Sequence, residues 1–292
     1  MKNCRNFLII TNEIKDPELR WSNMALKLIT DKGYKAELHA GLQSEGLEQC
    51  FEDTDVIMVM GGDGTMLRVS HALNGRNIPV IGINLGTVGF LTEATVAELD
   101  EVIDRLAAGD YAVEDRMMLQ GTVRRNAPGK SGDSSADIED ISISHALNDI
   151  VLARESALRL IAVEIYVNGI HFDTCEADGI IVSTPTGSTG YNLSAGGPIV
   201  KGDAKLMVMT PISPYSLSLR SVIFGAEDKI EIRLIKKRQD ALSSGLVSFD
   251  GAETFHMEVG SSVEIVPSSH TFSVVKLDNV SVYEILRKKL GG

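Results

Sequence analysis

Cysteine and aromatic residues are scarce in this chain. Its 292 residues include three cysteines and one tryptophan, and aromatic residues make up 5% of the total. Cys4, Cys50 and Cys175 form no CxxC pair and leave an odd count, which argues against a disulfide framework and against a zinc site. The histidines contain no HExxH motif, and His39 and His145 are expected on strand faces. We therefore predict no metal-ligand cluster, and a reducing, cytoplasmic location.

Long apolar runs and an excess of basic residues are also missing. No run approaches the roughly 18 apolar residues that a membrane-spanning helix needs, and the apolar segment 7–10 is too short for a signal peptide. The chain has 28 Lys and Arg against 40 Asp and Glu, a formal charge of -12, which repels polyanions at long range. We expect neither nucleic acid nor a membrane as a partner, and any phosphate must be bound by local groups.

The amino-terminal part of the chain alternates strand and helix patterns. Short apolar segments predict strands at 7–10, 35–39, 56–60 and 78–83. A first helix is predicted from Asp16 and Pro17 to Gly33. Two further helices carry spacing and capping signals: Met66, Val69 and Leu73 before Asn74-Gly75, and the capping box Thr95-x-x-Glu98 before Gly109. This alternation implies a parallel sheet with right-handed crossovers.

From about Met117 the pattern changes to short strands and turns. Val163, Ile165 and Val167 alternate with polar residues, and Asn168-Gly169 is a strong hairpin signal into 170–175. More strands are predicted at 222–224, 230–235, 246–249, 263–266 and 272–277, an exposed loop at 126–140 and a short helix at 283–290. We expect an α/β domain over 1–116, completed by 278–292, and an all-β sandwich or layered sheet over 117–277.

A glycine turn follows the apolar strand 56–60. Gly61, Gly62 and Gly64 carry no Cβ, so a phosphate can approach the backbone at the start of the next helix. Asp63 is unexpected there, because a carboxylate repels phosphate unless a cation or a proton transfer requires it. Its presence suggests that Asp63 takes part in a reaction. The alternative is that Asp63 only caps a helix beginning near Met66.

A second motif occupies 177–200, ADGIIVSTPTGSTGYNLSAGGPIV. Its hydroxyl groups, its glycines and Tyr191, which can stack on a base, are components of a nucleoside pocket. The alternative is an ordinary turn region rich in Ser and Gly.

These motifs together resemble one family. Gly61-Gly62-Asp63-Gly64-Thr65, the segment 81–91 (IGINLGTVGFL), Asn148-Asp149 and the segment 178–198 are similar in order and spacing to the NAD kinases. The first motif is shared with diacylglycerol kinases and phosphofructokinases, whereas the long second motif is much more specific. The resemblance implies phosphoryl transfer from ATP to the 2′-hydroxyl of the adenosine ribose of NAD.

The resemblance also implies roles for particular residues. Asp63 would be the base or orienting group for the hydroxyl. Phosphate and ATP would contact Gly61, Gly62, Gly64 and Thr65, with Arg68 as a further candidate whose alternative is a solvated helix face. NAD would contact Phe90, Asn148, Asp149, Asp178, Thr186, Thr189, Gly190 and Tyr191. Gly190 stands where many members have alanine, and Asp149 stands where many have glutamate. We expect these two differences to affect the shape of the pocket and the substrate preference rather than the activity.

The expected chemistry requires few protein groups. Phosphoryl transfer has a loose transition state, so the protein mainly positions phosphates and stabilises charge. Mg²⁺ is expected to arrive bound mostly through ATP oxygens, with no metal cluster in the protein. The resemblance also implies that this chain forms a homodimer or a homotetramer. A lipid kinase and an NAD-sensing module without turnover are the rival functions.

Overall fold

The computed structural model of this protein describes residues 2–41, 47–86, 89–126, 138–156, 159–216, 218–236, 244–277 and 287. The chain forms two compact units, Met1–Arg116 with Thr271–Gly292 (unit 1) and Met117–His270 (unit 2). No helix in the described part of the chain is long and apolar enough to cross a membrane. The predicted helix at 283–290 lies outside the described residues except for Arg287, and so does most of the predicted loop, from 127 to 137.

Unit 1 is built on a parallel sheet, as predicted. Its strands lie in the order β2 (Lys35–Ala40), β1 (Asn6–Thr11), β3 (Val56–Gly61) and β4 (Val80–Asn84), and all three pairings are parallel. The short strand β5 (Ala94–Thr95) continues this pairing on β4. The last strand of the described residues, β17 (Ser262–Lys276), contributes Val274, which pairs in parallel with Val80.

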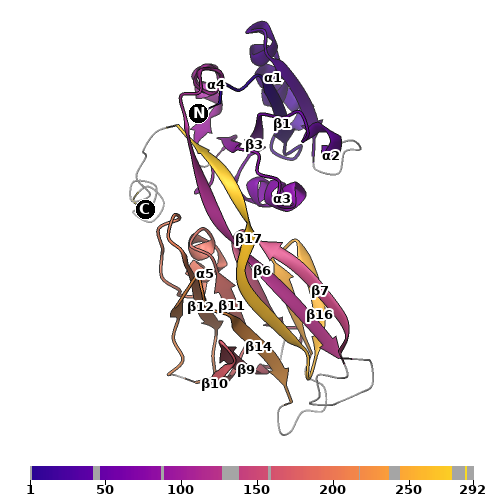
Figure 1. Ribbon diagram of the computed structural model, residues 1–292, viewed down its shortest axis with the longest axis vertical. Coiled ribbons are helices and arrows are strands. Elements are labelled where there is room, and N and C mark those ends of the chain that lie inside the picture. Colours follow the sequence, from indigo (N-terminus) through magenta and orange to yellow (C-terminus); the bar gives the residue numbers. More distant parts are fainter. Residues whose placement is uncertain are drawn as a thin grey trace. The chain divides into compact units, whose positions relative to one another are not determined.

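Helices cover this sheet (Figure 1). Helices α1 (Arg20–Asp31) and α4 (Leu99–Ala108) share one buried core with alternate side chains of β1 and β3, because successive residues of a strand point to opposite faces. Helix α3 (Asp63–Leu73) follows β3 and buries Met66, Val69 and Leu73, the predicted apolar face. The other helices among the described residues of this unit are short: α2 (Leu47–Cys50), η1 (Pro17–Leu19) and η2 (Val96–Glu98).

The predicted helix ends are partly correct. The Thr95–Glu98 capping box is confirmed, and Asn74 ends α3 in the left-handed conformation. The first helix, however, begins at Arg20 rather than at Pro17, because Leu19 has a φ of 55° and breaks the helical path. Asp16 still stabilises its start, since its carboxylate accepts hydrogen bonds from the backbone N–H groups of residues 21 and 22.

Unit 2 contains antiparallel strands in two sheets, confirming the predicted all-β part. The first sheet has the order β13 (Val222–Gly225), β12 (Leu206–Ile212), β11 (Gly179–Ser183), β8 (Asp149–Arg154), β15 (Ser244–Phe249) and β16 (Glu253–Glu258). The second contains β10 (Ile170–Ala177), β9 (Ile161–Val167), β14 (Ile230–Ile235), β17, β6 (Ala112–Asn126) and β7 (Ile138–Ala146). One buried apolar cluster takes side chains from both sheets, among them Ile150, Val163 and Ile180.

Two local predictions in this half have different outcomes. The Asn168-Gly169 hairpin is confirmed, with φ angles of 52° and 79° at its two turn residues, as a tight type I′ turn requires. The segments 263–266 and 272–277, predicted as separate strands, form the single strand β17. Pro267 and the serines after it resemble a turn in sequence, but strand pairing keeps their backbone extended and overrides the local preference.

Candidate active site

The glycine turn of unit 1 lies at the carboxyl end of β3, where ligands of parallel sheets bind. All six residues of β3 are buried, and Gly62 immediately precedes α3. A Cβ on Gly61 would lie 2.6 Å from the hydroxyl oxygen of Thr65, and one on Gly62 would lie 2.9 Å from Nζ of Lys15. Sequence reasoning missed Lys15, which comes from the segment after β1 and brings an ammonium group to the turn.

Asp63 is not the capping residue of the helix. Helix α3 begins at Asp63 itself, and Gly62 occupies the N-cap position. The carboxylate oxygens of Asp63 accept hydrogen bonds from two backbone N–H groups, Oδ2 from Phe90 at 2.9 Å and Oδ1 from Leu91 at 3.0 Å. The capping alternative is therefore wrong, and Asp63 joins the glycine turn to the loop that follows β4.

Gly89 makes this contact possible. A Cβ at Gly89 would lie 1.9 Å from Oδ1 of Asp63, so any side chain there would displace the carboxylate. The Gly89 N–H donates to the hydroxyl oxygen of Thr92 at 3.0 Å, which holds Gly89 in place beside the Asp63 carboxylate. Each carboxylate oxygen carries further lone pairs, so Asp63 is held in one orientation and still has acceptor capacity.

The other predicted residues of unit 1 have different surroundings. Gly64 is exposed, and among the described residues no atom beyond its own helix neighbours lies within 4 Å of where a Cβ would be. Arg68 is exposed on α3. Thr65 is 3% exposed, and its hydroxyl accepts a hydrogen bond from the Asn12 side chain at 3.2 Å. Phe90 is half-buried and contributes its N–H to Asp63.

Unit 2 contains a pocket of about 480 Å³. Three of its lining residues were predicted to bind NAD: Asn148, Asp149 and Tyr191. Tyr191, the first residue of the short helix α5 (Tyr191–Ser194), is 47% exposed, so its ring is available to a ligand. The other lining residues are Val151, Ala153, Leu246, Ser248, Asp250, Gly251 and Thr254.

Asp250 organises this pocket and was not predicted. Its carboxylate accepts hydrogen bonds from three successive backbone N–H groups, those of Leu147, Asn148 and Asp149, at 2.7, 2.8 and 3.0 Å. The N–H of Asp250 in turn donates to the carbonyl oxygen of Asp149. Asp250 has a φ of 52°, a conformation that aspartate tolerates better than most residues. An isolated aspartate before Gly251 gave no clear signal in the sequence.

The carboxyl group of Asp149, in the pocket, has a shifted pKa. It is 6% exposed, and burial, together with the charge of Asp250, raises its pKa to about 7. A raised pKa in a pocket is typical of functional groups, although structural carboxyl groups also show it. Asp149 therefore changes charge near neutral pH.

The hydroxyl-rich segment has a more structural role than its composition suggests. The hydroxyls of Ser183, Thr184 and Ser188 donate to backbone carbonyl oxygens inside unit 2. A Cβ on Gly187 would lie 2.1 Å from the carbonyl oxygen of Asn148, so the segment packs directly against the pocket turn.

Two predicted threonines of this segment lie in the turn before α5. The hydroxyl of Thr189 donates to the carbonyl oxygen of Thr186 at 3.3 Å. Within the described residues, the buried hydroxyl oxygen of Thr186 has no hydrogen-bond partner. An unpartnered buried hydroxyl is costly, which makes Thr186 the threonine of this segment best suited to a ligand.

Asp178 lies outside the lining of the pocket. Its Oδ1 is 2.5 Å from Nε of Arg154, and its carboxylate is about as exposed as the arginine it faces. Gly190 lies beside the pocket, since a Cβ there would be 3.5 Å from Nδ2 of Asn148 and 3.9 Å from Oδ2 of Asp149.

The class of this protein follows from unit 1: a glycine turn between a buried parallel strand and a helix start is the anion site of nucleotide-binding α/β proteins. Two protein-family models identify the particular family. The ATP-NAD kinase N-terminal domain matches residues 23–111, and the ATP-NAD kinase C-terminal domain matches residues 147–277. The chain belongs to the NAD kinase family.

Curated relatives and solved structures agree with this assignment. An NAD kinase of Agathobacter rectalis is 37% identical over 98% of this chain and 99% of its own length, and one of Geobacter metallireducens is 38% identical over 86% and 84%. An NAD kinase from Archaeoglobus fulgidus, solved in complex with ATP, has a TM-score of 0.74 at 25% identity and 98% coverage of both chains. Yeast NADH kinase, complexed with NADH, shares the fold with a TM-score of 0.87 at 23% identity, covering 100% of this chain and 88% of its own.

Proposed function

We propose that this protein transfers the γ-phosphoryl group of ATP to the 2′-hydroxyl of the adenosine ribose of NAD, forming NADP, and that Asp63 is the catalytic carboxylate. The orientation of Asp63 by the N–H groups of Phe90 and Leu91 is the observation on which the proposal rests. A group fixed before substrate arrives needs no reorganisation during the reaction. Asp63 accepts the proton of the 2′-hydroxyl as the oxygen–phosphorus bond forms and ADP leaves.

The glycine turn is proposed to bind the phosphates of ATP. The start of α3 supplies backbone N–H groups and a favourable dipole for an anion. The ammonium group of Lys15 beside Gly62 adds a positive charge at the turn of a chain whose formal net charge is -12. The Archaeoglobus relative in complex with ATP supports ATP as the donor.

Mg²⁺ is proposed to bind mainly through the triphosphate. Asp63 is the acidic side chain of the glycine turn. This fits an ion that keeps several waters and takes one or two carboxylates together with substrate phosphates. When bound, the ion neutralises charge on the transferring phosphoryl group.

The pocket of unit 2 is proposed to bind NAD. Tyr191 presents an exposed ring for stacking, and Asn148 and Asp149 offer amide and carboxyl groups to ribose hydroxyls and amides. Thr186 offers a buried hydroxyl that has no partner among the described residues. The homo-oligomeric state and the cytoplasmic location stay predictions from the sequence.

The test is NADP formation from NAD, ATP and Mg²⁺ by the purified protein, followed with an NADP-specific dehydrogenase, beside Asp63→Asn. Asparagine keeps the size of the side chain but cannot accept the proton, so we expect turnover to fall by about 10²- to 10⁴-fold, the usual contribution of a general base. NAD binding should change little. An Asp63→Asn protein with native turnover would contradict the role of Asp63, and NAD binding without any product in the native protein would favour a sensor.

A further inference from the structure

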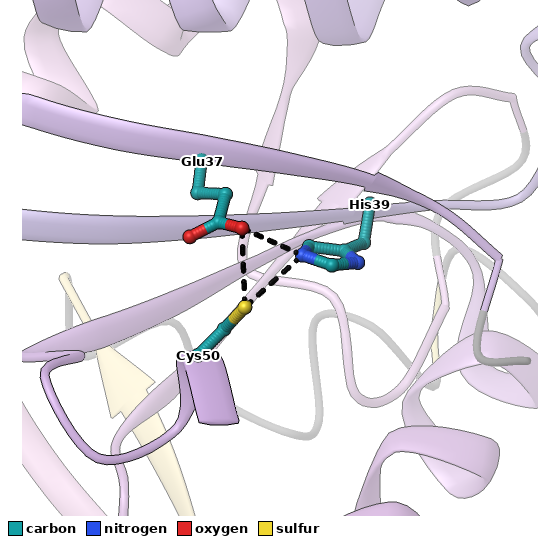
Figure 2. Close-up of side chains that lie close together, drawn as sticks. All are labelled: Glu37, His39 and Cys50. Atoms are coloured by element: carbon teal, nitrogen blue, oxygen red, sulfur yellow. Dashed lines mark hydrogen bonds and ion pairs between the residues drawn. The ribbon is translucent and has the colours of Figure 1, made fainter. Parts of the chain in front are cut away.

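A second group of reactive side chains lies on the edge of the parallel sheet in unit 1. Glu37 and His39 belong to β2, the last strand in the described sheet order, and Cys50 is the final residue of α2. Residues two apart in a strand point to the same face, so Glu37 and His39 project together. Figure 2 shows all three side chains pointing toward one another.

The three polar atoms converge closely. Nε2 of His39 lies 3.0 Å from Oε1 of Glu37, and Sγ of Cys50 lies 3.1 Å from that oxygen and 3.2 Å from the His39 nitrogen. Three atoms about 3 Å apart leave a point roughly 2.0–2.3 Å from each of them, which is the range of zinc–oxygen, zinc–nitrogen and zinc–sulfur bond lengths. In a tetrahedral site the same atoms would be about 3.4–3.6 Å apart, so only small side-chain movements are required.

The three atoms are also of a particular chemical kind. One sulfur, one imidazole nitrogen and one carboxylate oxygen form a set that suits zinc-type ions. Mg²⁺ prefers oxygen ligands alone, so this cluster differs in chemistry from the site of the ATP-bound ion. Across the described residues, it is the one group of three His, Cys, Asp or Glu side chains whose ligand atoms converge in this way.

We propose that Glu37, His39 and Cys50 bind one divalent transition-metal ion of the zinc type, with three protein ligands and an open fourth position. On binding, the sulfur–metal bond replaces the sulfur–hydrogen bond of Cys50, and the proton leaves to solvent. His39 is 8% exposed, whereas Glu37 is exposed, so the ion enters from the side of Glu37. The bound ion connects the edge strand β2 to α2.

The competing interpretation is a purely hydrogen-bonded cluster. In the absence of an ion the Cys50 thiol donates to Glu37, and burial, together with the Glu37 carboxylate, raises the pKa of Cys50 to about 11. A protonated thiol satisfies the same geometry without metal. The experiment must therefore detect the sulfur–metal bond itself.

The experiment titrates the metal-free, full-length protein with Co²⁺ in the absence of nucleotide. Co²⁺ takes zinc sites, and a thiolate ligand gives it an intense near-ultraviolet charge-transfer band. We expect this band to saturate at one equivalent of Co²⁺ and to disappear on addition of Zn²⁺. Cys50→Ser should abolish the band, whereas Cys175→Ser, which alters a buried cysteine of unit 2, should leave it unchanged.

Glu37→Gln provides a variant at an exposed position that does not threaten folding. It should weaken Zn²⁺ binding by more than about tenfold, since losing even an outer-shell partner of a metal ligand costs that much. Zn²⁺ should raise the Tm of the native protein and do so far less in Glu37→Gln and Cys50→Ser. No thiolate band in the native protein, the same band in Cys50→Ser, or an equal rise in Tm in all variants would overturn the proposal.

Discussion

Asp63 of unit 1 and Asp149 of unit 2 are both candidate substrate-binding carboxyl groups, yet their surroundings are opposite. Asp63 is partly exposed and accepts a backbone N–H on each oxygen. Asp149 is buried, and the N–H groups of its own turn donate to Asp250 instead. The backbone donors thus go to the candidate carboxylate itself, Asp63, in unit 1, and to Asp250, the neighbour of the candidate Asp149, in unit 2.

The surroundings of Asp63 fix the orientation of its carboxylate, whereas the surroundings of Asp149 change the pKa at which it becomes charged. Donors on both oxygens of Asp63 fix the plane of its carboxylate, as proton acceptance in a phosphoryl transfer requires. Asp149 instead faces a second carboxylate, that of Asp250, so burial and repulsion raise its pKa to about 7. Asp63 is suited to catalysis at a fixed geometry, and Asp149 to binding whose strength depends on pH.

Of the predictions that follow, the largest effect is expected from moving the Asp63 carboxylate while the residue itself is kept. In Gly89→Ala the new methyl group would lie 1.9 Å from Oδ1 of Asp63, so the carboxylate must move. Displacement of a catalytic group by about 1 Å can cost roughly 100-fold in rate. We expect kcat for NADP formation to fall by about that factor, with NAD affinity retained.

Gly86→Ala is the matched control, because no atom of the described residues beyond its chain neighbours lies within 4 Å of its added Cβ. It replaces a glycine of the same loop without touching Asp63, and its kcat should stay close to native. Equal losses in the two variants would show that the loop responds to any alanine, and would remove the argument for a positioned carboxylate.

The fold was more predictable from sequence than the site. Strands β1 to β4 and the capping box at Thr95 follow local patterns of apolar residues and end signals, and they were found. Gly89 and Asp250 were missed as positioning residues, because their importance depends on contacts with groups far away in sequence, Asp63 and the turn at 147–149. The convergence of Cys50 with Glu37 and His39 was missed for the same reason, since their spacing in the sequence does not show that the three side chains meet.

A moderate effect is expected from the charge of Asp149. Its pKa of about 7 means that the group is mainly protonated at pH 6 and mainly ionised at pH 8. A hydrogen bond to an ionised acceptor exceeds a neutral one by about 1 kcal/mol. NAD should therefore bind roughly fourfold more tightly at pH 8 than at pH 6, measured by calorimetric titration, because about a tenth of the group is in the other form at each pH.

Asp149→Asn should remove this dependence on pH, because the amide does not titrate. Asn148→Ala is a useful comparison, since it removes a neighbouring pocket group but leaves Asp149 in place, and it should keep the pH dependence. A pH dependence that persists in Asp149→Asn would assign the titration to another group and leave Asp149 without the proposed role.

The smallest effect is expected at Gly190, where the resemblance suggested a difference in pocket shape. An added Cβ would lie 3.2 Å from the carbonyl oxygen of Gly187, which must yield by a few tenths of an ångström, and 3.5 Å from Nδ2 of Asn148, which is an ordinary van der Waals contact. NAD affinity in Gly190→Ala should change by no more than about threefold, equivalent to roughly 0.7 kcal/mol. The methyl group would also lie 3.9 Å from Oδ2 of Asp149, and this added apolar burial should shift the midpoint of the pH-dependent NAD binding upward. A tenfold loss of affinity with an unchanged midpoint would mean that residue 190 acts through the backbone of the 187–190 turn rather than through Asp149.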